Sequence, residues 1–80
     1  MLAIPDFRTS EERQAWFREN ADYFTCTCRI NRTACTSAFH TLQEARKAAA
    51  NYARDLKRPV LLYAVIGNSS EWLENKYPAH

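Results

Sequence analysis

The chain has 80 residues and a formal net charge of +2, with 46% hydrophobic and 25% charged residues. This length fits one domain, residues 1–80, and the composition is that of a globular protein and excludes a disordered chain. The small net charge argues only weakly for a polyanion partner, and the single glycine, Gly67, excludes a glycine-rich phosphate-binding loop.

The first predicted element is a helix over residues 10–19. Thr9 and Glu12 have the spacing of a capping box, in which each side chain accepts a hydrogen bond from the other residue's backbone amide. Trp16 and Phe17 are the large apolar residues of this segment, and we expect them to face the core.

Two strands joined by a short turn are expected next, over residues 23–30 and 33–39. Apolar and polar residues alternate along the first of them, which is typical of a half-buried strand. The register that turns the apolar residues of both strands toward the core sets Cys28 directly opposite Cys35. A shift by one residue would turn the wrong side chains inward, so the hydrophobic match favours this register.

A second capping box, Thr41 and Glu44, opens a helix predicted over residues 42–57. The strand at 60–66 is apolar enough to be buried on both faces, and residues 70–77 fit a short edge strand better than a helical turn. Three apolar residues are expected in the core: Phe39, Leu56 and Leu62. These elements predict an α+β fold of order α-β-β-α-β-(β), a small antiparallel-rich sheet with its helices packed on one face.

Cysteine usage indicates reduced thiols. The pattern C-x-C-x6-C-x4-H lacks the knuckle spacing of zinc sites, and Cys26 and Cys28 share a strand face with apolar residues. No apolar run could cross a membrane, and residues 1–5 do not resemble a signal peptide, so we expect a cytoplasmic protein. We therefore predict buried thiols, no metal and no other cofactor, with a Cys28–Cys35 disulfide as the alternative.

Catalytic residues are missing from the pattern. A nucleophilic cysteine needs a base within hydrogen-bond reach, but Cys35 and His40 stand an odd number of positions apart on one strand and so point to opposite faces. No serine has an obvious histidine partner. The sequence predicts a binding protein that is not an enzyme.

Three surfaces are candidates for binding. Carboxylates of the acidic first segment could pair with a basic groove on another protein: Glu11, Glu12, Glu19 and Asp22. The basic end of the second helix is the alternative, for nucleic acid: Arg54, Lys57 and Arg58. Solvated helix faces whose charges complement the helix dipole would look the same. The outward sheet face has a composition that resembles a protein interface, and an antiparallel sheet with one solvated face would look much the same: Tyr23, Thr25, Thr27, Arg29, Thr36 and Tyr63.

Residues 39–72 contain the sequences Phe-His-Thr-Leu-Gln-Glu-Ala and Leu-Leu-Tyr-Ala-Val. They resemble small orphan phage and prophage proteins of proteobacteria, in which F-x-T-x-x-E-A opens a helix and L-x-Y-A-V forms the next strand. Proteins of this type include anti-CRISPR inhibitors. The resemblance implies a phage protein for host defence evasion, which binds a host protein or nucleoprotein complex such as a CRISPR effector and blocks nucleic-acid engagement. It carries over no functional residue.

Two other functions remain open. A small nucleic-acid-binding accessory protein would use the basic second helix and bind DNA or RNA directly. The other is a structural or regulatory prophage protein. Direct contact with nucleic acid is the weaker expectation, because the charge is small and the order of elements excludes the common RNA-binding folds.

Overall fold

A computed structural model of the chain describes residues 3–78; the outermost residues of the predicted domain, 1–2 and 79–80, lie outside this range. It confirms an α+β fold with two helices and a four-stranded antiparallel sheet of strand order β2-β1-β3-β4. The elements are α1 (Ser10–Asn20), β1 (Tyr23–Ile30), β2 (Thr33–Phe39), α2 (Leu42–Leu56), β3 (Val60–Ile66) and β4 (Ser69–Lys76). The tail is therefore a strand, as the sequence favours. Within residues 3–78, no helix is long and apolar enough to cross a membrane.

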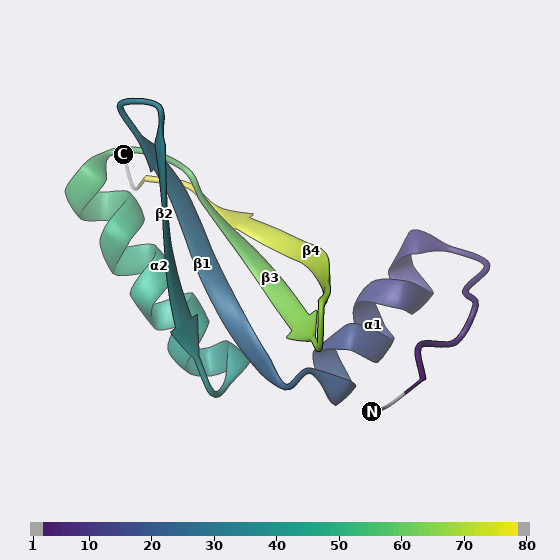
Figure 1. The fold of residues 1–80 in the computed structure, drawn as a ribbon. Coiled ribbons are helices and arrows are strands. Elements are labelled where there is room, and N and C mark those ends of the chain that lie inside the picture. Colours follow the sequence, from purple (N-terminus) through teal and green to yellow (C-terminus); the bar gives the residue numbers. More distant parts are fainter. Residues whose placement is uncertain (1–2, 79–80) are drawn as a thin grey trace.

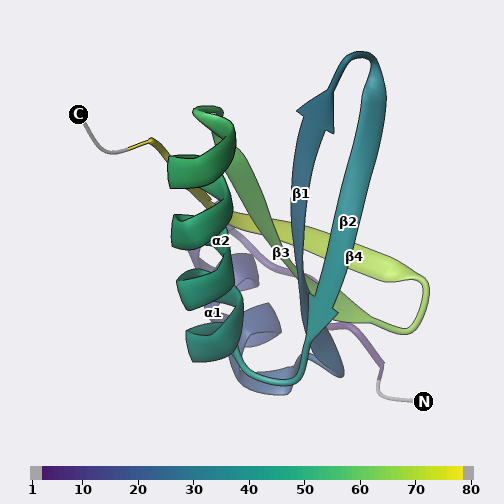
Figure 2. The ribbon, with the colours of Figure 1, turned by 90° about the vertical axis from the view of Figure 1, so that its left-hand side faces the viewer.

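Both helices pack on the same face of the sheet (Figures 1 and 2). Helix α2 crosses β1 and β3, and α1 packs beside β3 and β4. The core lies between the helices and this face. In the part of the chain that the structure describes, no helix covers the opposite face.

Both helices begin at the predicted caps. The hydroxyl of Thr9 accepts a hydrogen bond from the amide of Glu12, and that of Thr41 accepts one from the amide of Glu44, each at 3.1 Å. The return bonds differ from a standard capping box. The carboxylate of Glu12 accepts from the amide of Arg8, and the carboxylate of Glu44 accepts from the Thr41 hydroxyl.

The β1–β2 hairpin has the predicted register, with Cys28 directly opposite Cys35. Its two turn residues, Asn31 and Arg32, both have a positive φ, at 51° and 72°. Two such residues make a primed turn, whose twist matches that of the paired strands.

The buried stripe of α2 consists of alanines. Ala45, Ala49 and Ala53 are completely buried, so the helix backbone lies close to the sheet. The prediction that Leu56 is a core residue is wrong, since it is 36% exposed. The alanines take the positions that face the sheet, which turns Leu56, like Tyr52, toward the edge of the helix interface.

The prediction that Leu62 belongs to the core is confirmed, and the one for Phe39 is partly right. Leu62 is completely buried, and Phe39 is half-buried and packs against the core from the edge strand. The prediction that β3 is buried on both faces is only partly right. Leu61 and Tyr63 are half-buried, because they point to the face that no helix covers.

Candidate binding face on the uncovered side of the sheet

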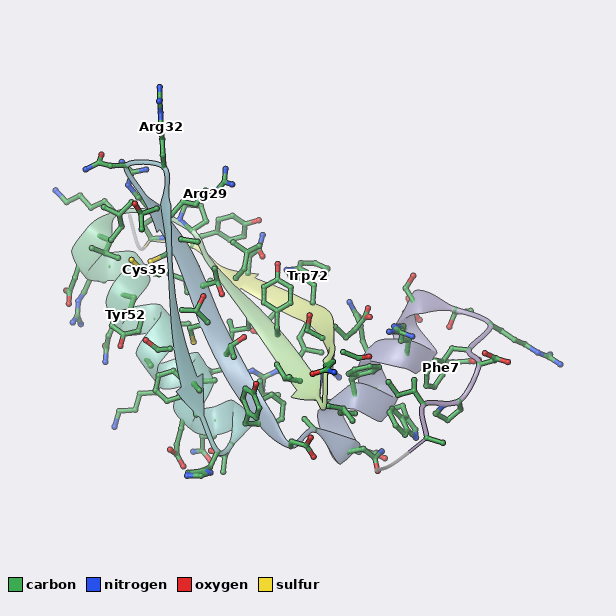
Figure 3. All side chains as sticks on the ribbon, viewed as in Figure 1. Phe7, Arg29, Arg32, Cys35, Tyr52 and Trp72 are labelled. Atoms are coloured by element: carbon green, nitrogen blue, oxygen red, sulfur yellow. The ribbon has the colours of Figure 1, made fainter. Side chains whose placement is uncertain are left out.

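Strand alternation brings one set of side chains onto the face without helices, which we call the outer face. Its members are cross-strand neighbours of one another: Tyr23, Thr25, Thr27, Arg29, Ala34, Thr36, Ala38, Leu61, Tyr63, Val65, Ser70, Trp72 and Asn75. Tyr23 is 39% and Trp72 is 44% exposed. Arg29 is the one charged residue in this set, and the set contains no aspartate or glutamate. Figure 3 shows Arg29 and Trp72 on the side of the sheet away from Tyr52.

Hydrogen bonds hold several outer-face side chains in place. The hydroxyls of Thr27 and Thr36 bond across the β1–β2 pair at 3.1 Å. The indole N–H of Trp72 donates to the side-chain oxygen of Asn75 at 2.7 Å, and the Asn75 amide donates to the Tyr77 hydroxyl. Trp72 is therefore an exposed aromatic ring in a fixed orientation, which lowers the entropy lost when a partner packs on it.

A hollow of about 480 Å³ opens at one end of the outer face. The basic side chains of Arg29 and Arg58 line it, together with a mainly apolar wall formed by Pro59, Leu61 and Tyr63. Both arginines are exposed, and neither forms an ion pair within residues 3–78. The hollow thus offers two guanidinium groups beside apolar surface.

The three basic residues predicted as a nucleic-acid site have different surroundings, and their role in binding stays a prediction. Arg54 pairs with its neighbour Asp55 at 3.1 Å. Lys57 has a left-handed backbone (φ 56°) and caps α2 at its C-terminal end. The helix therefore ends at Leu56, one residue earlier than predicted. Arg58 follows the cap and lines the hollow, so the fold places it with Arg29 of β1.

The four predicted carboxylates are exposed but have different surroundings. Glu12 accepts the Arg8 amide at the start of α1, and Asp22 accepts the backbone amide of Gly67 at 2.9 Å. Glu11 and Glu19 lie on the exposed side of α1. None of the four belongs to the outer face, and their role in binding stays a prediction.

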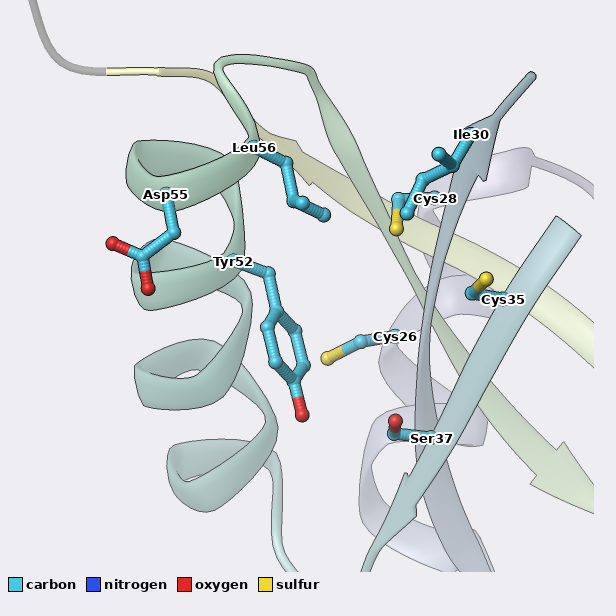
Figure 4. A pocket seen from close by; sticks show the side chains of 8 residues that line it. All are labelled: Cys26, Cys28, Ile30, Cys35, Ser37, Tyr52, Asp55 and Leu56. Carbon is cyan, nitrogen blue, oxygen red and sulfur yellow. The ribbon is translucent and has the colours of Figure 1, made fainter.

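The three cysteines line a second groove, of about 350 Å³, between α2 and the β1–β2 hairpin (Figure 4). Cys26 and Cys28 are buried as predicted, but Cys35, which lies on the edge strand β2, is exposed. Tyr52 and Leu56 form the helix side of the groove. Among residues 3–78, no three His, Cys, Asp or Glu side chains are grouped so that they could hold a metal ion.

Burial changes the chemistry of one thiol. The pKa of Cys26 is raised from 9.0 to about 11, mainly because burial desolvates the thiolate; a hydrogen bond from the backbone of Ala49 opposes the shift, and the neighbouring Cys28 adds to it slightly. The Cys26 sulfur lies 3.1 Å from the carbonyl oxygen of Ala45, to which the thiol donates. Cys26 is thus a protonated core residue at neutral pH. Cys35 lies in β2, and His40 follows that strand's end in a separate hollow beside Tyr23.

Comparisons with known protein families, with curated proteins and with solved structures gave no match for this chain. The phage-like resemblance of residues 39–72 therefore gains no support from them.

Sequence reasoning found six of the thirteen outer-face residues and missed Leu61 and Trp72 among the others, and it also missed Pro59 of the hollow. The period-two pattern of β3 separates Leu61 and Tyr63 from Leu62, so the signal was present. It could not be used without the β1–β3 register, which joins segments more than 30 residues apart in the chain.

Proposed function

We propose that this chain is a non-enzymatic binding protein that docks on another protein through its outer face. One observation carries the proposal: an uncovered face of a four-stranded sheet presents Tyr23, Tyr63, Trp72 and Arg29 and has no carboxylate. Aromatic residues and arginine are enriched at protein interfaces, whereas aspartate, glutamate and lysine are depleted.

Nucleic acid is the second candidate, favoured by the two arginines beside Tyr63 in the hollow. Binding to a polynucleotide draws its affinity from many phosphate contacts along the chain. On the outer face the positive charge is confined to one end, and the middle row of Thr25, Tyr63 and Trp72 carries no charge. This distribution favours a protein partner.

The narrower form of the proposal is an anti-CRISPR-like inhibitor that binds a host nucleoprotein complex and blocks nucleic-acid engagement. It is supported by the resemblance of residues 39–72 to phage proteins, and the outer face supplies the surface. The exposed carboxylates of α1 are a second surface by which such an inhibitor could pair with a basic groove.

The test of the face compares two variants of similar chemistry. The double variant Tyr23→Ser/Trp72→Ser removes the two most exposed aromatic rings of the outer face, and Tyr52→Ser removes an exposed ring from the helix side. Each immobilised protein is exposed to host extract, and proteins retained by the unaltered chain are quantified. We expect the double variant to retain at least ten-fold less partner protein than the unaltered chain, and Tyr52→Ser to retain the same amount. Equal retention by all three proteins contradicts the proposal.

The narrower form needs a defined target. A purified CRISPR effector is mixed with DNA, with and without this protein, and DNA binding is followed by mobility shift. Inhibition that disappears with Tyr23→Ser/Trp72→Ser supports an inhibitor that acts through the outer face. Inhibition that disappears only with Glu11→Lys/Glu19→Lys assigns the contact to α1. Tight binding of bare DNA at physiological salt supports the nucleic-acid function instead.

A further inference from the structure

The two arginines of the hollow come together through the sheet register. Strands β1 and β3 are antiparallel, and Thr27 pairs with Leu61. Arg29 lies two residues after Thr27, and Pro59 lies two residues before Leu61, just ahead of β3. The antiparallel arrangement therefore brings Arg29 to the level of Pro59, and Arg58 comes directly before Pro59. Residues almost 30 positions apart in the sequence thus line one hollow at the end of the sheet.

The charge of this hollow is not neutralised within the fold. Three other arginines of the domain have carboxylate partners: Arg13 pairs with Glu71, Arg46 with Glu74 and Arg54 with Asp55. Arg29 and Arg58 form no ion pair among residues 3–78. A guanidinium group binds a carboxylate through two parallel hydrogen bonds, and such a bond is stronger than one between neutral groups.

We propose that this hollow binds an acidic side chain of the partner protein, with its carboxylate between Arg29 and Arg58 and an adjacent apolar side chain on Leu61 and Tyr63. The inference rests on the proposed function and names the chemistry of the partner. The apolar wall excludes water from one side of the ion pair, which strengthens the attraction. A volume of about 480 Å³ lies within the range of pockets that hold small ligands, so one or two side chains fit.

A carboxylate fits the surroundings better than the phosphates of a nucleic acid. A bound strand would leave the hollow and pass over the outer face, where the next side chains are Thr27, Thr25 and Ala38 and no further cation follows. A single acidic group needs only the two arginines. Charge complementarity is thus local, as expected for one acidic residue within a protein interface.

The test uses three probes of defined chemistry on the full chain. The acidic probe is the peptide acetyl-Glu-Phe-Glu-amide; acetyl-Lys-Phe-Lys-amide and ten-residue oligothymidylate are the comparisons. Binding is followed by nuclear magnetic resonance of backbone amides and arginine Nε–H groups at low salt. We expect the acidic peptide to bind weakly, with a Kd of about 1 mM, and to shift the signals of Arg29, Arg58 and Tyr63.

Matched variants decide the assignment. Arg29→Gln/Arg58→Gln should weaken binding of the acidic peptide at least ten-fold. Arg18→Gln, which replaces an exposed arginine on α1, should leave this binding unchanged. Unchanged melting temperatures show that the variants are folded. The proposal is overturned by shifts spread over all arginines, by equal binding of the basic peptide, or by preferential binding of the oligonucleotide. Those outcomes are distinct from a failure of the docking face, which is read from Tyr23→Ser/Trp72→Ser in the host extract.

Discussion

The carboxylate of Asp22 accepts a hydrogen bond of 2.9 Å from the backbone amide of Gly67. The amide of Asp22 in turn donates to the carbonyl of Val65 at 2.8 Å. Asp22 therefore links the junction between α1 and β1 to the turn between β3 and β4, where Gly67 has a positive φ. A residue that the sequence offers as a binding carboxylate thus holds two parts of the fold together.

Replacement of Asp22 tests this structural role. Asp22→Ala should lower the free energy of unfolding by about 1 kcal/mol, because the amide of Gly67 loses its acceptor. Glu19→Ala changes an exposed carboxylate at the end of α1 and should stay within about 0.5 kcal/mol of the unaltered protein. Urea denaturation measures both. Equal effects would mean that the bond to Gly67 contributes nothing.

Thiol reactivity should separate the three cysteines. Cys35 is exposed, whereas Cys26 and Cys28 are buried, and a thiol must be accessible to react. In freshly reduced native protein, Ellman's reagent should label Cys35 rapidly and the other two slowly, and denatured protein should give three thiols. Fast labelling that persists in Cys35→Ser would place a second cysteine at the surface.

Stability at alkaline pH should carry the signature of Cys26. The unfolded thiol ionises near its ordinary pKa of 9.0, and the native one near 11. The unfolded chain loses this proton first, so the contribution of Cys26 to stability is fully present below pH 9 and is lost as pH rises toward 11. The loss reaches about 1.4 kcal/mol per pH unit in that window.

Cys26→Ala provides the comparison. Other groups also titrate above pH 9, so the measured quantity is the difference in unfolding free energy between the two proteins at pH 8, 9 and 10. This difference should shrink as pH rises. A constant difference would show that the thiol ionises equally in both states.

Two leucines should differ sharply in the core. Leu62 is completely buried, and Leu62→Ala should cost about 2–5 kcal/mol. Leu56 is 36% exposed on the side of the cysteine groove, so Leu56→Ala should cost about 1 kcal/mol or less. Thermal or urea unfolding distinguishes them, and a larger loss from Leu56 would contradict the packing of α2.

Local patterns were enough to predict the elements of this fold. The hydroxyls of Thr9 and Thr41 cap their helices where expected, and the alternation along β1 fixed the pairing of Cys28 with Cys35. Details that depend on distant segments were beyond the sequence. The alanine stripe shows how closely α2 approaches the sheet only when its partner strands are known, which is why Leu56 was placed in the core.

The candidate site divides in the same way. Arg29 and Tyr23 could be assigned to an outward face from β1 alone. Arg29 and Arg58 line the same hollow because β1 pairs with β3, a long-range contact that no local pattern specifies. Arg58 was consequently grouped with Arg54 and Lys57, its neighbours in the chain.

The docking of α1 has a consequence for how the chain reaches this structure. Phe17 is the largest completely buried side chain among residues 3–78, and its helix packs on β3 and β4. Arg13 pairs with Glu71, and Gln14 donates to the carbonyl of Trp72, each across 58 positions of sequence. Contacts of such long range carry a large loop-closure cost and slow folding. During synthesis α1 can therefore complete its packing only after β4 has emerged, and a product that stops before β4 lacks the partners of Arg13 and Gln14.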